Sequence, residues 1–115
     1  MDCSNKKWKK AYNALTETLN EIQSQLRPGI EGNYLHNLCE EILSKLGYKG
    51  KMPHYLGHGI GLYIHEPPFL APGSKDVLRE GMVISVEPSI VLEEENMGIR
   101  LEKEFLITSN GCELL

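Results

Sequence analysis

The chain has no apolar run of the roughly 18 to 20 residues that a membrane-spanning helix needs, and its N-terminus lacks the apolar core of a signal peptide. It is also poor in cysteine. The three cysteines, Cys3, Cys39 and Cys112, are odd in number and unevenly spaced, which is not the pattern of a disulfide framework. These absences favour a reducing, intracellular compartment, and we expect a cytoplasmic protein without a membrane partner.

Neither the net charge nor any repeat in the sequence points to a particular class of partner or architecture. Twelve basic and 16 acidic residues leave a formal net charge of -4, which gives no reason to expect a nucleic-acid partner. Neither an internal repeat nor a low-complexity segment is present. With 115 residues and 41% hydrophobic content, the chain can bury a modest core, and we expect residues 1–115 to form a single domain.

Two amphipathic helices are predicted in the N-terminal part of the chain. The first has an apolar stripe at steps of four and three, formed by Trp8, Tyr12, Leu15, Leu19, Ile22 and Leu26. Pro28 and Gly29 end it. The second has a stripe formed by Leu35, Leu38, Ile42 and Leu46. Gly47 supplies the left-handed position after this helix, and His36 is expected on its surface.

After Gly47 the pattern changes to strands and turns. The apolar runs 82–92 and 99–108 are rich in Val and Ile and are joined by a polar turn at 93–96, as expected for antiparallel strands. Helices followed by such strands predict an α+β fold, in which two helices cover one face of a curved, mostly antiparallel sheet.

The run Gly57–Pro67, GHGIGLYIHEP, carries His58 and His65 in a glycine-rich extended segment that lets other groups approach closely. Each later apolar run carries a lone acid, Glu87 in MVISVEP and Glu102 in GIRLE. A carboxylate in a segment that is otherwise buried is costly unless a cation pairs with it. One histidine and two carboxylates make a plausible half-site for a divalent metal.

Three blocks of sequence resemble in order and spelling the C-terminal half of the catalytic domain of the pita-bread metallopeptidases: residues 57–67, residues 80–88, and residues 98–102 with 108–113. This group includes methionine aminopeptidases, Xaa-Pro aminopeptidases and Xaa-Pro dipeptidases (prolidases). Arg100, two residues before Glu102, favours the Xaa-Pro branch, with methionine aminopeptidase as the alternative. The two residues share alternation parity, so we expect them on one face of a strand.

The resemblance implies metal-assisted hydrolysis near the free N-terminus of a peptide substrate. It implies that His58, Glu87 and Glu102 are metal ligands and that Glu87 also shuttles a proton. It further implies that His65 is a catalytic group and that His54, His65 and Arg100 bind the substrate. Imidazole and carboxylate donors suit manganese, cobalt, iron or zinc about equally.

The family's two-metal centre also takes two aspartates from an upstream hairpin. The two aspartates here are Asp2, at the N-terminus, and Asp76, in a turn-rich stretch, and neither is placed as a paired ligand. We therefore expect a truncated portion of a catalytic domain that holds at most one weakly bound ion and is inactive alone. Its open sheet edge is expected to form a homo-oligomer or to pair with the missing N-terminal segment.

Other interpretations stay open. Members of this fold that have lost metal ligands serve as non-catalytic peptide- or protein-binding modules, although retention of three ligands together favours an enzyme. Simple structural roles are also possible. His58 would then bond to backbone, His65 would precede the turn at Pro67, and Glu87 and Glu102 would be strand acids facing water.

Overall fold

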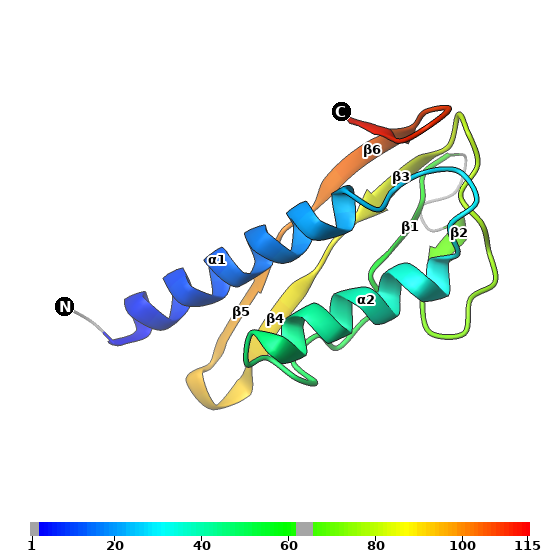
Figure 1. Cartoon of the computed structure of the whole chain (residues 1–115). Helices are drawn as coiled ribbons and strands as arrows, with labels where there is room; N and C mark the ends of the chain where they lie inside the picture. The colour runs from blue at the N-terminus through cyan, green and yellow to red at the C-terminus, as the bar shows by residue number, and fades with distance from the viewer. Residues whose placement is uncertain (1–2, 62–65) are drawn as a thin grey trace.

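The computed structural model describes residues 3–61 and 66–115. The helices in this part of the chain are α1 (Cys3–Gln23) and α2 (Gly32–Lys45) (Figure 1). The strands are β1 (Gly57–Gly59), β2 (Glu66–Leu70), β3 (Val83–Val86), β4 (Ser89–Leu92), β5 (Met97–Arg100), β6 (Lys103–Ile107) and β7 (Cys112–Leu114). A short 3-10 turn, η1 (Glu93–Glu95), joins β4 to β5.

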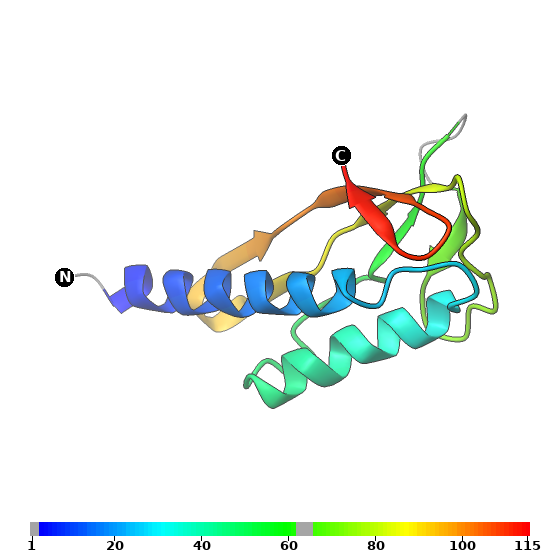
Figure 2. The same cartoon turned by 45° about the horizontal axis from the view of Figure 1, so that its top comes forward.

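Five strands form one sheet in the order β2-β1-β3-β6-β7, and β4 and β5 form a separate ribbon. Every pairing among these strands is antiparallel. Figure 2 shows both helices on the same side of the strands. The predicted α+β architecture, with two helices over one face of an antiparallel sheet, is confirmed.

The core lies between the helices and the sheet. From the strands it takes alternate residues, which all point to the helix side because side chains alternate across a strand: Ile84, Val86, Phe105 and Ile107. Cys39 of α2 is also in this core, and burial raises the pKa of its thiol to about 12, with a smaller contribution from Glu40. The thiol therefore stays protonated near neutral pH and packs as a small apolar group.

The first two members of the α1 stripe depart from the prediction. Trp8 and Tyr12 are 44% and 40% exposed, and their rings stack with centroids 5.3 Å apart. The buried face is turned toward Ala11 and Ala14, because this half of α1 packs closely over the β4–β5 ribbon. Small residues allow that approach, and they leave the large rings at the edge of the contact.

His36 was expected on the surface of α2, and that prediction is wrong. Its side chain is only 2% exposed, and its Nδ1 accepts a hydrogen bond of 3.2 Å from the backbone N–H of Leu56. Leu56 in turn accepts a bond of 2.8 Å from the N–H of Glu87. His36 is buried because α2 packs against the segment that leads into β1.

Each predicted strand run divides into two strands at its acidic residue. The first run breaks at Glu87-Pro88, between β3 and β4, and the second breaks after β5 at Leu101-Glu102. Pro88 has no N–H to offer a ladder, which favours the first break. The chain thus leaves the five-stranded sheet at Glu87 and returns to it just after Glu102.

Among the residues that the structure describes, neither helix has the length and apolar character needed to cross a membrane.

Candidate functional site

His58 lies on β1, the strand that is packed between β2 and β3. His58 lies opposite Phe69 of β2 and Ser85 of β3. A Cβ at the neighbouring Gly57 would collide with the backbone carbonyl of Ser85, and a Cβ at Gly59 would collide with the carbonyl of Pro67. The glycines in this motif are therefore required by the approach of β2 and β3 on both sides of β1.

The structure brings the three predicted metal ligands together around one serine. His58 Nε2 lies 3.0 Å from Glu87 Oε2. The Ser85 hydroxyl lies 2.9 Å from Glu87 Oε2 and 2.9 Å from Glu102 Oε2. Ser85 is fully buried, and His58 is buried as well. The two strand breaks at Glu87 and Glu102 turn both carboxylates toward this point.

These contacts place two carboxylates beside few hydrogen-bond donors. His58 Nδ1 lies 2.9 Å from the carbonyl oxygen of Gly59, which can only accept, so Nδ1 carries a proton. A neutral His58 then presents a lone pair at Nε2 to the carboxylate of Glu87. Ser85 has one proton for two carboxylates. Arg100 contacts Glu87 at 3.5 Å, and a further cation between the two carboxylates would be stabilised.

His54 and Arg100 lie at the rim of the same site. They line a hollow of about 200 Å³ together with His58 and Glu87. His54 Nδ1 donates to the carbonyl of Tyr55 at 2.7 Å, and its Nε2 lies 2.6 Å from the hydroxyl of Ser89. This arrangement fixes the orientation of the His54 ring.

The partner of Arg100 differs from the prediction. Arg100 is the last residue of β5, and Glu102 lies beyond that strand, so the two do not share one strand face. Arg100 instead lies with Nη1 3.5 Å from Glu87 Oε1, with 54% of its side chain exposed. This contact is long and open to water, and it orients Glu87 weakly.

His65 is outside the described residues. Asp76 uses its carboxylate to accept the backbone N–H of Phe69 at 2.9 Å, which anchors β2.

Sequence reasoning missed Ser85 and Ser89. Ser85 stands two residues before Glu87, and residues two apart in an extended chain point to the same side. A small polar residue in the otherwise apolar run MVISVEP was the available signal. Ser89 carried no comparable signal, because its contact with His54 depends on how the ribbon folds back.

The fit of metal ions to these residues is limited. Within residues 3–61 and 66–115, no group of three or more His, Cys, Asp or Glu side chains is already arranged to hold an ion. Two of the three candidates are in direct contact, and the third joins them through Ser85. One imidazole and two carboxylates are donor types that suit one divalent ion. A pair of ions does not fit, because the described residues offer no second set of ligands.

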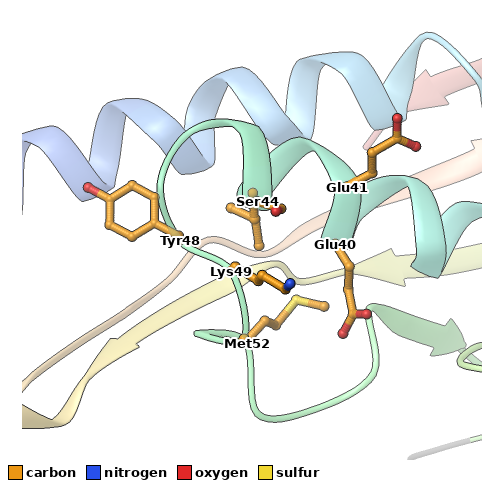
Figure 3. A pocket seen from close by; sticks show the side chains of 8 residues that line it. Glu40, Glu41, Ser44, Tyr48, Lys49 and Met52 are labelled. Carbon is orange, nitrogen blue, oxygen red and sulfur yellow. The ribbon is translucent and has the colours of Figure 1, made fainter.

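Another hollow, of about 340 Å³, lies at the C-terminal end of α2 and contains none of the predicted site residues (Figure 3). Figure 3 shows Glu40 and Glu41 pointing to different sides of the helix, as expected for adjacent helical residues. Their carboxylates do not converge. This hollow therefore offers no catalytic or metal-binding arrangement.

Residues 3–109 match the model of metallopeptidase family M24. The chain belongs to this family. It is 38% identical over 111 residues to the Xaa-Pro dipeptidase of Pyrococcus horikoshii, a match that covers 96% of the chain and 31% of that protein. It is 37% identical over 111 residues to an uncharacterized peptidase of Methanocaldococcus jannaschii, covering 93% of the chain and 31% of that relative.

Solved structures agree with the family assignment. The prolidase from P. horikoshii superimposes with a TM-score of 0.88 at 37% identity, covering 95% of this chain and 31% of that one. The X-Pro aminopeptidase from Thermotoga maritima gives a TM-score of 0.88 at 32% identity, covering 94% of this chain and 30% of that one. This M24 chain therefore has part of the pita-bread fold and spans about 31% of the length of its curated relatives.

Proposed function

We propose that this chain supplies part of the active site of a metal-dependent, Xaa-Pro peptidase-like hydrolase that cleaves near the N-terminus of a peptide. The observation that carries the proposal is the convergence of His58, Glu87 and Glu102 on Ser85, where Arg100 reaches one of the two carboxylates. The names of the M24 relatives, Xaa-Pro dipeptidase and X-Pro aminopeptidase, support the Xaa-Pro branch over methionine aminopeptidase.

One divalent ion would be held by His58, Glu87 and Glu102. His58 Nε2 and Glu87 Oε2 lie 3.0 Å apart, so both donors could contact the same ion. When bound, such an ion lowers the pKa of a coordinated water and polarises a substrate carbonyl. Manganese, cobalt, iron and zinc all accept these donors. The ion is weakly held, because only two anionic ligands are present.

The other side chains orient the reacting groups. Glu87 is the proton shuttle; His58 and Ser85 hold its Oε2, and Arg100 contacts its Oε1 more weakly. His54 and Arg100 line the same hollow and bind the substrate. His65 is assigned to the substrate and its developing charge by resemblance alone.

The test is whether these 115 residues hydrolyse peptides without further protein. We expect no measurable turnover of Xaa-Pro dipeptides or of Met-initiated peptides with added manganese or cobalt, because the paired activation of water needs a second ion. We expect turnover to appear when an upstream segment bearing the two aspartates that the family resemblance implies is joined or co-expressed. Robust metal-dependent turnover by the chain alone would contradict this.

A non-catalytic peptide- or protein-binding role is the second candidate. It is favoured by the lack of a ready three-ligand group in residues 3–61 and 66–115. This role predicts that the chain stays inactive even when the upstream segment is joined or co-expressed.

The strands β2 and β7 form the edges of the five-stranded sheet. Pairing at either edge would give a homo-oligomer or a complex with the upstream segment. Light scattering of the chain alone separates these from a monomer.

A further inference from the structure

Ser85 connects two carboxylates that would otherwise repel each other. Its hydroxyl is completely buried on β3 and lies 2.9 Å from one oxygen each of Glu87 and Glu102. The two acids come from different strand breaks and are 15 residues apart in sequence. The backbone brings them opposite each other, because Val86 pairs with Lys103 on one side and the Leu101 N–H donates to the Pro88 carbonyl at 3.1 Å on the other. Ser85 adds a contact between their side chains.

The two carboxylates depend on Ser85 to different degrees. Glu87 also contacts His58 and Arg100. Within the described residues, Ser85 is the side-chain hydrogen-bond partner of Glu102. Removing the hydroxyl should therefore release Glu102 and leave Glu87 largely in place.

We propose that Ser85 is a positioning residue, whose hydroxyl holds the carboxylate of Glu102 against that of Glu87 so that both face one divalent cation. This inference rests on the proposed function, because it presumes that the cluster binds such an ion. A hydrogen bond to a charged ligand is strong and directional, and groups that orient metal ligands typically contribute about 10- to 100-fold to affinity. The contribution of Ser85 comes from holding Glu102 and not from the shape of the serine side chain.

The experiment compares Ser85→Thr with Ser85→Val in the full chain. The two variants have nearly the same shape and share any steric effect of the added methyl, but only threonine keeps the hydroxyl. Manganese affinity is measured by calorimetry, and folding is checked by circular dichroism. We expect Ser85→Thr to bind within about threefold of the original chain and Ser85→Val to bind about tenfold more weakly, which corresponds to about 1.4 kcal/mol.

A second comparison separates positioning from a general structural effect. It measures the free energy of unfolding of the metal-free chain in urea. In a Glu102→Ala background the hydroxyl has no second carboxylate to hold, so the difference in this free energy between Thr and Val at position 85 should be smaller than in the original background. Ser85→Ala, which adds no methyl, serves where the larger residues do not fold, and it should also bind about tenfold more weakly than the original chain.

Each result decides between the claims. Equal manganese affinity for Ser85→Thr and Ser85→Val, or for Ser85→Ala and the original chain, overturns the role of Ser85 and leaves the metal site standing. A Thr–Val difference in the free energy of unfolding that is unchanged by Glu102→Ala also overturns it. If the original chain binds no manganese at millimolar concentration, the proposed metal site fails together with this inference.

Discussion

Glu87→Gln is expected to remove measurable divalent-ion binding by this chain. Glu87 is the centre of the cluster, with one oxygen 3.0 Å from His58 Nε2 and 2.9 Å from the Ser85 hydroxyl. The substitution replaces an anionic oxygen ligand by a neutral amide. Because loss of a supporting group alone lowers metal affinity about 10- to 100-fold, loss of a ligand should lower it at least about 100-fold. Calorimetric titration with manganese measures the change.

A matched variant separates ligand loss from the change in net charge. Glu113→Gln removes one negative charge from an exposed residue of β7, outside the cluster. Its manganese affinity should stay within about twofold of the original, because exposed charges are well screened by salt. Equal affinities for Glu87→Gln and Glu113→Gln would show that Glu87 is not a ligand.

Gly57→Ala is expected to destabilise the fold by about 3 kcal/mol or more, or to prevent folding. The added Cβ would collide with the Ser85 carbonyl oxygen and would lie 3.3 Å from the side chain of Leu70. The carbonyl belongs to the β1–β3 ladder, so it cannot move without breaking strand pairing. The free energy of unfolding in urea, or the yield of soluble protein, reports this loss.

Gly111→Ala provides the control, because it makes the same chemical change in open surroundings. The nearest atom to its added Cβ is Thr108 Oγ1, at 3.9 Å, which is ordinary contact distance. We expect a change of less than about 1 kcal/mol in either direction. If Gly57→Ala were tolerated as well as Gly111→Ala, the close approach of β1 and β3 described here would be incorrect.

The fold was predictable from sequence because its elements are locally encoded. Apolar residues at steps of three and four predicted α1 and α2, and Gly47, with a φ of +95°, ends α2 as expected. The sequence was less reliable in predicting which residues at the N-terminal end of the α1 stripe are buried. The stripe of α1 extends to Trp8, but a stripe does not say which of its edges faces a partner, and the β4–β5 ribbon favours Ala11.

Long-range contacts explain what the sequence did not predict at the site. Val- and Ile-rich runs predicted strands. The breaks at Glu87 and Glu102 arise where the chain passes between the five-stranded sheet and the β4–β5 ribbon, and the strand propensity of single residues does not predict such a break. His36 is buried by the segment before β1, and Arg100 meets Glu87 because β5 ends before Glu102. Ser85 became visible only when both acids were seen to share its hydroxyl.

The most direct test of the proposed metal site is electron spin-echo spectroscopy of the chain loaded with manganese. The site predicts modulation from one imidazole nitrogen, because His58 Nδ1 already donates to Gly59 and leaves Nε2 for the ion. This modulation should vanish in His58→Gln and persist in His54→Gln, whose ring is bonded to Ser89. Bound manganese without nitrogen modulation, or modulation that survives in His58→Gln, would contradict the proposed site.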